Sequence, residues 1–345
     1  MSAVVNVKMR IGELFDSVKK DEHKTYVIAE IGINHEGCVD RCADLIRLSA
    51  SAGADAIKLQ TVDASQCYAP DTESYKVFSE ATLTEAETAN MFQLARDCGV
   101  DAFSTSGDLQ TLKWVDRLNP AAHKISSGLL SCTPIVKEAC KFGRPVFMST
   151  GMSGTATIDK SVEIARQSGC QTALFQCTSL YPCPIEKLDL NAIGGLSKRY
   201  RMPTGFSDHS LGIHMAPLAV AAGARLIEKH ITFDKNRSGF DHSISLETDE
   251  FAEMVTLVRQ AETAMGQANK TVDNVIFEQA QQFERRLAAA HDLPAGHLLT
   301  IDDLLFMRFS KNIDAISSCE ADAVVDRHIN TAISAGQSIK WQYLS

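Results

Sequence analysis

The amino-acid sequence predicts an α/β fold, a (β/α)8 TIM barrel followed by a small β-rich domain. Eight short runs rich in apolar and β-branched residues recur along the first two thirds of the chain, and segments of helical period separate them. Near-continuous apolar runs are typical of strands that are buried on both faces of a parallel sheet. Eight such units favour a closed barrel. An open, doubly wound sheet is the alternative, but no GxGxxG motif follows the first run, which disfavours it.

The segments between the predicted strands have the pattern of capped helices. Those at residues 42–53 and 84–96 repeat apolar residues at helical spacing, and several segments end at a glycine. A polar residue before the first turn and a glycine after the last turn are typical helix boundaries. The predicted strands between these helices are residues 26–31, 56–60, 101–105, 123–127, 145–150, 172–178, 203–207 and 226–231.

The C-terminal part of the chain has a different pattern. A long helical stretch at residues 249–266 is followed by a polar connection and then by short apolar runs with turn residues between them. We therefore expect a barrel domain at residues 1–270, a linker at 271–284 and a small β-rich domain at 285–345. Residues 1–22 are expected to cap the barrel, with residues 4–22 forming a hairpin that closes its bottom.

The composition is that of an ordinary soluble protein, with 45% hydrophobic and 22% charged residues. The net charge of −9 argues against nucleic acid or an anionic membrane as a partner. No apolar run is long enough to span a bilayer, and the first residues lack the apolar core of a signal peptide. Ten cysteines without a CxxC pair indicate thiols in a reducing compartment. We therefore predict a cytoplasmic protein.

Polar and charged residues occur near the C-terminal ends of all eight predicted strands. TIM barrels build their active sites at this end. Such residues are costly inside a barrel unless they are paired or used. Their presence on every strand therefore predicts a site there, made from Glu30, Asn34, His35, Lys58, Gln60, Thr105, Lys124, Ser126, Ser127, Ser149, Thr150, Thr178, Ser179, Tyr181, Ser207, Asp208, His209, Glu228, Lys229 and His230.

Each of these residues also has a purely structural interpretation. Lys58 or Lys124 alone could be half of a buried ion pair, but two lysines together favour a site for a phosphate-bearing anion. His209 and His230 could each be a core histidine bonded to a backbone carbonyl. Because the seventh and eighth strands are neighbours, both imidazoles could instead reach one Mn²⁺, Zn²⁺ or Fe²⁺ ion. Asp241 could equally be an ordinary loop acid.

The strand ends carry an ordered set of motifs: IAEIGINHEG at 28–37, GADAIK at 53–58, KISSG at 124–128, STGM at 149–152, CTSLYP at 177–182, GFSDH at 205–209 and EKH at 228–230. Together they resemble the motifs of the N-acetylneuraminate (sialic acid) synthases, a family that includes spore coat polysaccharide biosynthesis proteins. In the tail, RRLAAAHDLPAG at 285–296 and DDL at 302–304 resemble that family's antifreeze-like SAF domain. The likeness covers nearly the whole chain.

The resemblance implies a metal-dependent condensation. Phosphoenolpyruvate would join, through its C3, the aldehyde carbon of an open-chain N-acylated amino sugar such as N-acetylmannosamine. Phosphate would leave, and a nine-carbon 2-keto sugar acid like sialic acid would remain, for surface polysaccharides. By similarity, His209 and His230 would hold the Mn²⁺ or Mg²⁺ that polarises the aldehyde.

The resemblance also assigns the other side chains. Glu30 would contact the sugar or the reacting centre. In the family, the SAF domain covers the partner subunit's site in a domain-swapped homodimer and contributes an arginine, and Arg308 matches its position. Phosphoenolpyruvate would be bound by Lys58, Lys124, Thr105 and Ser127, and the sugar by Tyr181, Glu228 and Asp241, with Ser179 nearby.

This chain departs from the family pattern on the sugar side. Leu129 stands where many members have an acid, Ser106 and Gly107 where Pro and Phe are common, and Ser179 where Asn is common. Residues 307–310 also lack the usual Arg-Pro-Gly. Two other functions stay open: a Schiff-base aldolase that uses Lys58 or Lys124 as nucleophile on a keto acid, and a catalytically weak sugar-binding protein, which Leu129 suggests.

Overall fold

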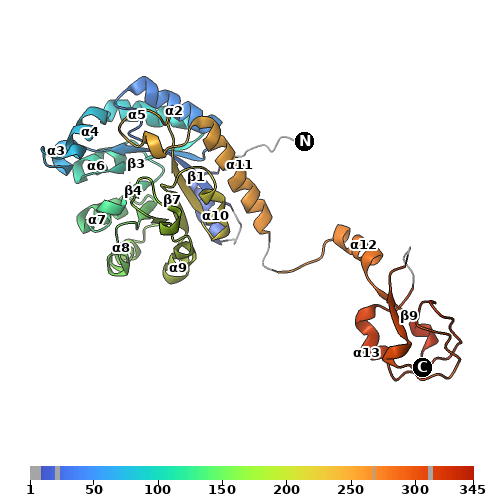
Figure 1. Cartoon of the computed structure of the whole chain (residues 1–345). Coiled ribbons are helices and arrows are strands. Elements are labelled where there is room, and N and C mark those ends of the chain that lie inside the picture. Colours follow the sequence, from blue (N-terminus) through green and yellow to red (C-terminus); the bar gives the residue numbers. More distant parts are fainter. Residues whose placement is uncertain (1–8, 20–23, 267–268, 310–313) are drawn as a thin grey trace. The chain divides into compact units, whose positions relative to one another are not determined.

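Eight parallel strands close into a barrel in the order of the sequence, and β1 is hydrogen-bonded to both β2 and β8 (Figure 1). The computed structural model describes residues 9–19, 24–266, 269–309 and 314–345. The predicted barrel is therefore confirmed, and the open-sheet alternative is wrong. The strands are β1 Tyr26–Gly32, β2 Ala56–Thr61, β3 Asp101–Ser106, β4 His123–Ile125, β5 Val146–Ser149, β6 Thr172–Cys177, β7 Thr204–Asp208 and β8 Leu226–His230.

Helices cover the outside of this barrel (Figure 1). The helix from Glu85 opens with a capping box, because Thr84 Oγ1 accepts a hydrogen bond from the Glu87 backbone N–H while the Glu87 carboxylate accepts one from Thr84 N. Among the described helices, none is both long and apolar enough to cross a membrane. The helices are α2 Val39–Ser51, α3 Ala64–Cys67, α4 Glu73–Ala81, α5 Glu85–Asp97, α6 Leu109–Arg117, α7 Thr133–Lys141, α8 Thr155–Gln167, α9 Asn191–Tyr200, α10 Met215–Ala221 and α11 Thr248–Met265.

Alternate residues of β1 face two different apolar clusters. Val27, Ala29 and Ile31 belong to a cluster between the strands and the helices, whereas Tyr26 and Ile28 belong to one inside the barrel. This follows from the period of two along a strand. Every residue of β1 is buried, which is why the sequence shows a nearly continuous apolar run.

Aromatic rings fill the N-terminal half of the barrel interior. Phe147 packs edge-on against both Phe103 and Phe175, with ring centroids 5.5 and 5.9 Å apart. All three side chains are fully buried. This layer closes the barrel from below, so the inward-facing polar residues further along the strands open only to the C-terminal end.

Residues at the N-terminus form a helix, α1 (Ile11–Lys19), where the sequence predicted part of a hairpin. Leu14 and Phe15 are buried in the inner cluster and cover the bottom of the barrel. The hairpin prediction was wrong because apolar residues at 11, 14 and 15 follow helical spacing, which buries one face of a short helix. The other residues of the predicted cap, 1–8 and 20–22, lie outside the described residues.

The chain divides into two compact units, Met1–Gly266 and Gln267–Ser345. The second holds an antiparallel pair, β9 Arg286–Ala289 and β10 Leu304–Met307, and a short helix, α13 Ala321–Val324, around its own apolar core. The stretch predicted as a linker contains a helix, α12 Asn274–Phe283. Asp273 caps this helix by accepting a hydrogen bond from Ile276 N (2.8 Å).

Gly205 of β7 has no room for a side chain. A Cβ there would lie 2.7 Å from Leu226 Cβ and 2.8 Å from Phe175 Cε1. Because overpacking forces backbone shifts, we predict that Gly205→Ala lowers the free energy of unfolding by about 1–3 kcal/mol in urea titrations. Gly195→Ala is the control, since this exposed residue of α9 has nothing within 4 Å and should gain about 0.5–1 kcal/mol. Equal stability of the two variants would contradict the packing argument.

Candidate active site

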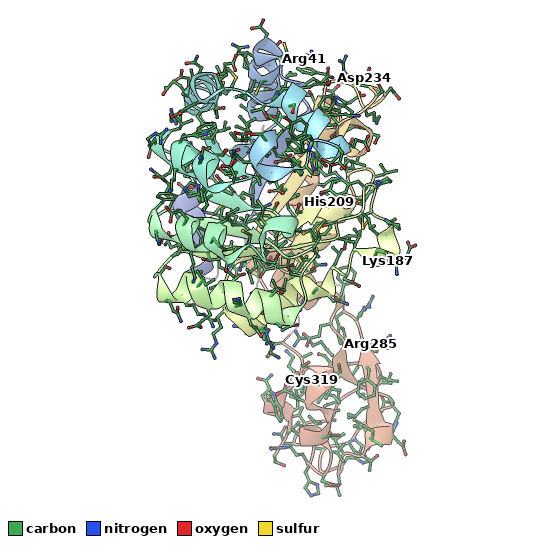
Figure 2. All side chains as sticks on the ribbon, turned by 90° about the vertical axis from the view of Figure 1, so that its left-hand side faces the viewer. Arg41, Lys187, His209, Asp234, Arg285 and Cys319 are labelled. Atoms are coloured by element: carbon green, nitrogen blue, oxygen red, sulfur yellow. The ribbon has the colours of Figure 1, made fainter. Side chains whose placement is uncertain are left out.

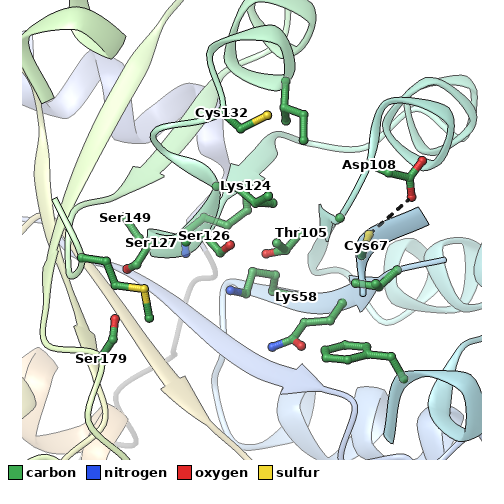
Figure 3. A pocket seen from close by; sticks show the side chains of 18 of the residues that line it. Lys58, Cys67, Thr105, Asp108, Lys124, Ser126, Ser127, Cys132, Ser149 and Ser179 are labelled. Atoms are coloured by element: carbon green, nitrogen blue, oxygen red, sulfur yellow. Dashed lines mark hydrogen bonds between the residues drawn. The ribbon is translucent and has the colours of Figure 1, made fainter. Parts of the chain in front are cut away.

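A cavity of about 970 Å³ opens at the C-terminal ends of the strands (Figure 3). His209, which also lines it, lies within the barrel unit, whereas Arg41 and Lys187 lie at the edge of that unit (Figure 2). Each of the eight strands contributes to the lining, so most of the polar residues predicted from the strand ends are brought together. One from each strand, in order, are Glu30, Lys58, Thr105, Lys124, Ser149, Cys177, Ser207 and Glu228.

Four charged side chains form a buried network at the base of this cavity. Lys58 Nζ lies 3.1 Å from both Glu30 Oε2 and Glu228 Oε1, and Lys124 Nζ lies 3.1 Å from the same Glu228 oxygen. All four side chains are at most 5% exposed. The buried ion pairs that the sequence left open are therefore present. Both lysines also line the cavity, so the ion pairs do not exclude an anion site.

The two carboxylates of the network differ in charge because they differ in partners. Burial raises the pKa of Glu30 to about 7, since Lys58 offsets only part of the desolvation. Burial acts on Glu228 in the same direction, but Lys124 and Lys58 outweigh it and hold the pKa of Glu228 well below its usual range. Ser207 Oγ also donates to Glu228 Oε1 (2.9 Å). Glu30 is thus the carboxyl that changes charge near neutral pH.

Hydroxyl groups line the same cavity as the two lysines. Thr105 Oγ1 is buried and has no hydrogen-bond partner among the described residues. Ser127 Oγ accepts a hydrogen bond from Gly151 N (3.1 Å). A Cβ on Gly151 would lie 2.8 Å from Cys177 Sγ and from Ser179 Oγ and 3.0 Å from Ser127 Oγ, so glycine lets the backbone pass close to these side chains without displacing them. Such donors beside ammonium groups suit a phosphate or carboxylate.

His209 and His230 lie at one side of the cavity, with ring centroids 5.7 Å apart. His209 Nδ1 lies 2.9 Å from Thr178 O, and because a carbonyl only accepts, Nδ1 carries the proton. His209 Nε2 faces Tyr181 OH at 3.1 Å. His230 Nδ1 is buried without a hydrogen-bond partner among the described residues, 3.8 Å from Asp241 Oδ2. Burial lowers the pKa of both histidines, so both rings are neutral at pH 7.

The imidazole pair fits a divalent metal. Neutral imidazole is a common metal ligand, and a ligand histidine usually donates its other N–H to a carbonyl or carboxylate, as His209 does to Thr178. His230 offers a buried nitrogen that no described residue satisfies. In the part of the chain that the structure describes, no three His, Cys, Asp or Glu side chains are grouped around one metal position. The other ligands would therefore be water or substrate oxygens.

The remaining predicted site residues divide between the two units. Ser179 and Tyr181 line the cavity, and Asp241 approaches His230 from the loop after β8. Arg308 belongs to the second unit, where its guanidinium carbon lies 5.4 Å from the ring centroid of Phe283. Most of the predicted residues of the barrel unit thus line one cavity. The predicted strand-end residues that do not line it are Asn34, His35, Thr150, Thr178, Asp208 and Lys229.

Some residues of the cavity had no predicted role. Gln60 Nε2 donates to Glu30 Oε1 (3.0 Å), and Ser207 belongs to the charged network. The sequence predicted both residues at the strand ends, two positions from another inward-facing site residue, but assigned neither a role. Leu129 and Met152 also line the cavity, but they come from loops, where no periodic pattern marks them.

Fold and site together define an α/β-barrel protein whose cavity combines cationic, hydroxyl and imidazole groups at the strand ends. The sequence matches the NeuB family over residues 45–270, and the chain belongs to this family.

Similar proteins span nearly the same length. The chain is 35% identical over 308 residues to an uncharacterised protein of Methanocaldococcus jannaschii, which covers 89% of this chain and 90% of that protein. It is 30% identical over 310 residues to the N,N'-diacetyllegionaminic acid synthase of Campylobacter jejuni, with 85% and 93% covered. The N-acetylneuraminic acid (sialic acid) synthetase from Leptospira borgpetersenii, solved in complex with citrate, superposes with a TM-score of 0.72 at 29% identity, over 75% of this chain and 90% of that one.

The raised pKa of Glu30 makes the stability of the barrel depend on pH. A carboxyl whose pKa is about 7 when folded and 4.5 when unfolded contributes stability that is full below pH 4.5 and lost as the pH rises through 7. Glu30→Gln cannot ionise, so over this range it should gain about 2–3 kcal/mol relative to the wild type. Urea unfolding from pH 4.5 to 8 measures this gain. Exposed Glu253→Gln is the control, and a pH-independent difference for Glu30→Gln would refute the assignment.

Proposed function

We propose that this protein condenses phosphoenolpyruvate with the aldehyde of an N-acylated amino sugar, giving a nine-carbon 2-keto sugar acid and phosphate. The observation that carries the proposal is one cavity in which two buried lysines and several hydroxyls lie beside two neutral imidazoles. Membership of the NeuB family supports it, because the similar protein of Campylobacter jejuni is a synthase of a related acid.

Lys58 and Lys124 would bind the phosphate and carboxylate of phosphoenolpyruvate, with Thr105 and Ser127 as hydroxyl partners. Charge-assisted hydrogen bonds are strong where water is excluded. Both ammonium groups contact Glu228, so an incoming anion competes with a carboxylate that is already in place. We therefore assign Glu228 to holding the lysines in position, in place of the sugar contact that the resemblance implied.

His209 and His230 would hold Mn²⁺ or Mg²⁺, and this metal, when bound, would polarise the aldehyde as a Lewis acid. Tyr181 and Ser179 line the same side of the cavity, and Asp241 stands beside His230. These three side chains would bind the hydroxyl and acylamino groups of the sugar. They would thereby hold the aldehyde carbon towards C3 of phosphoenolpyruvate.

The condensation needs protons to move at three oxygen positions, namely the aldehyde, the attacking water and the leaving phosphate. A bond forms between C3 of phosphoenolpyruvate and the aldehyde carbon, and the aldehyde oxygen takes up a proton. Water adds at C2 and loses a proton, which leaves a hydroxyl group on C2. Cleavage of the bond between C2 and the phosphate oxygen then releases phosphate, which takes up the remaining hydroxyl proton as the keto group forms. Glu30 lines the cavity with a pKa of about 7, which suits proton transfer at neutral pH. Leu129, also in the lining, has no proton to exchange.

Phosphate release tests the proposal. With phosphoenolpyruvate and a panel of mannosamine-type and diamino-sugar aldehydes, we expect release with an N-acylated acceptor, loss on chelation and recovery with Mn²⁺ or Mg²⁺. His209→Ala and His230→Ala should lower turnover by about two orders of magnitude or more, because each removes a metal ligand. His214→Ala, an exposed histidine outside the cavity lining, should retain turnover.

Two outcomes would replace this function with the others that the sequence left open. Burial lowers the pKa of Lys124, which favours a nucleophilic amine. Borohydride trapping of a keto acid on Lys124, together with turnover that needs no metal, would establish an aldolase. Binding of an amino sugar without phosphate release from any acceptor would establish a sugar-binding protein.

We further propose that the chain forms a domain-swapped homodimer in which the C-terminal unit serves as the SAF domain over the partner's cavity. The resemblance of residues 285–304 supports this arrangement. Leu305, Phe306 and Met307 of β10 are each about 40% exposed, and Arg308 directly follows them. Exposed apolar residues next to a cation are typical of a surface that contacts another surface. Arg308 would then reach the sugar in the partner's barrel.

Mixed dimers test whether Arg308 acts in trans. Arg308→Ala and Lys58→Met should each be nearly inactive as homodimers. If Arg308 acts on the partner's barrel, each mixed dimer contains one intact site and one doubly defective site. Free exchange of equal amounts should then restore about a quarter of wild-type phosphate release. No recovery after mass spectrometry has verified subunit exchange would mean that Arg308 does not act on the partner.

A further inference from the structure

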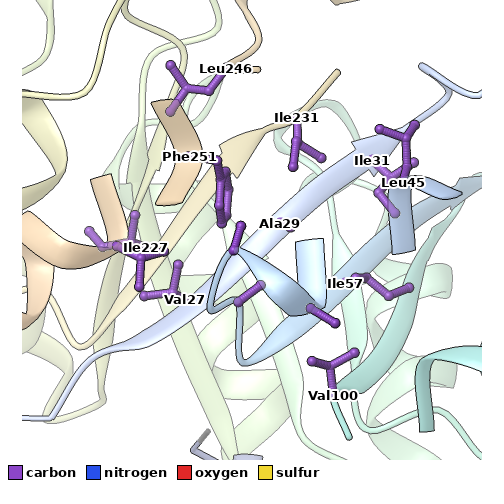
Figure 4. Packing of buried hydrophobic residues seen from close by; sticks show 14 of the residues in the cluster. Val27, Ala29, Ile31, Leu45, Ile57, Val100, Ile227, Ile231, Leu246 and Phe251 are labelled. Atoms are coloured by element: carbon purple, nitrogen blue, oxygen red, sulfur yellow. The ribbon is translucent and has the colours of Figure 1, made fainter. Parts of the chain in front are cut away.

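A second buried ion pair lies outside the cavity. Lys229 Nζ lies 3.0 Å from Asp208 Oδ2, and both side chains are 0% exposed. Phe206 of β7 and Ile227 of β8 face the same side as this pair and belong to the apolar cluster between barrel and helices. Figure 4 shows Ile227 in this cluster, together with Ile231, which directly follows β8. The pair therefore occupies outward positions of β7 and β8 in an otherwise apolar layer.

Stability alone does not explain such a pair. Removing two charges from water costs several kcal/mol per ion, and apolar residues of similar volume are often as stable or more so. Phe206 and Ile227 stand two residues before Asp208 and Lys229 and face the same layer. The other side chains of this layer are therefore apolar. The reason for the pair is therefore to be found in what it connects.

Lys229, which directly precedes His230, contacts both chain neighbours of His209. Its ammonium group donates to Asp208 Oδ2 and also to Ser210 O, on either side of His209. Asp208 Oδ1 accepts from Ser210 N (2.9 Å) and from Ser210 Oγ (2.6 Å), which closes a tight turn around His209.

This link lies where the backbone ladder ends. Asp208 and Lys229 are the last register partners of β7 and β8. β7 ends at Asp208, so His209 lies beyond the ladder, while His230 is the last residue of β8. Cross-strand hydrogen bonds between these two strands therefore do not fix His209 relative to His230, and the Lys229 contacts bridge the gap.

We propose that Asp208 and Lys229 are positioning residues that hold the two imidazoles at the spacing and orientation needed to share one divalent metal. The inference rests on the proposed function, because that function gives the imidazole pair its ligand. Other contacts hold His209 as well, since its carbonyl accepts from Cys183 N (2.9 Å) and its ring donates to Thr178 O. These contacts tie His209 to the segment after β6, whereas the Lys229 contacts tie the turn around His209 to β8.

The test compares two double variants. Asp208→Asn with Lys229→Met removes the charges and every Nζ contact, and the asparagine oxygen can still accept from Ser210. Asp208→Asn with Lys229→Gln also removes the charges but keeps a polar side chain that can donate across the strands. Thr61→Val with Ser104→Ala is the matched control, because it removes a buried cross-strand hydrogen bond (2.6 Å) of β2 and β3 away from the histidines.

Two readouts are needed, and the first is Mn²⁺ affinity from the electron paramagnetic resonance signal of the free ion. The Asn/Met variant should raise the Mn²⁺ dissociation constant at least about tenfold, as loss of supporting contacts around metal ligands does. The Asn/Gln variant should recover most of that loss, and the control should equal the wild type. Urea midpoints of the Asn/Met variant should equal or exceed the wild-type midpoint.

The second readout needs no metal. In ¹⁵N-histidine-labelled protein, the His209 Nδ1–H that donates to Thr178 O should give a protected proton signal, and the Asn/Met variant should lose it. If the wild type fails to bind Mn²⁺, the proposed metal site is wrong, and this signal alone decides whether the pair positions His209. Wild-type affinity and signal in the Asn/Met variant would overturn the inference. Failure of that variant to fold would overturn it too, since the pair would then serve stability.

Discussion

The pairing of four charges inside the barrel constrains the rest of this structure. Lys58 and Lys124 both contact one oxygen of Glu228, and Lys58 also contacts Glu30. An unpaired charge at such a depth would cost several kcal/mol, so none of the four can move without a replacement partner. The residues sit on β1, β2, β4 and β8, and their separations are set by the register of a closed barrel. The aromatic layer beneath them excludes water from below, which strengthens each contact.

The same network would favour a ligand that can replace a carboxylate. A phosphate or carboxylate offers both lysines the oxygen atoms that Glu228 now supplies, whereas a neutral ligand would leave the existing pairs intact. Two ammonium groups already balance two carboxylates, so an added anion brings excess negative charge. Glu30 is the member that can lose its charge most easily, since burial has already raised its pKa to about 7. Binding of an anion would therefore be linked to the protonation of one specific carboxyl, that of Glu30.

The sequence was sufficient for those parts of the structure that depend on periodicity. Strands buried on both faces gave continuous apolar runs, so all eight were found, and alternation placed Lys58, Lys124, Glu228 and His209 at the inward ends. It failed where a short amphipathic helix replaced a predicted hairpin at Ile11–Lys19, and where α12 formed within a predicted linker. The sequence also could not predict which charged residues would pair. Glu228 contacts both lysines only because the barrel closes, and closure brings together Lys124 and Glu228, which are 104 positions apart. The place of Arg308 depends on a second unit, so no pattern within the barrel could supply it.

Along β7 and β8, alternate residues face the cavity and the surrounding helices, and each face carries charged residues. Inward residues, Ser207 and Glu228, take part in the charged network at the base of the cavity. Outward residues at the adjacent positions, Asp208 and Lys229, form a second ion pair that faces the helices and does not line the cavity. His209 and His230 directly follow Asp208 and Lys229 in the chain. They lie closer to the cavity opening than Ser207 and Glu228. A substitution in the outer layer can therefore disturb the cavity without contacting a ligand, because both layers share the same two backbone segments. Packing alone does not require the Asp208–Lys229 ion pair in the outer layer. Its connection to the imidazoles of His209 and His230 explains why the pair is there.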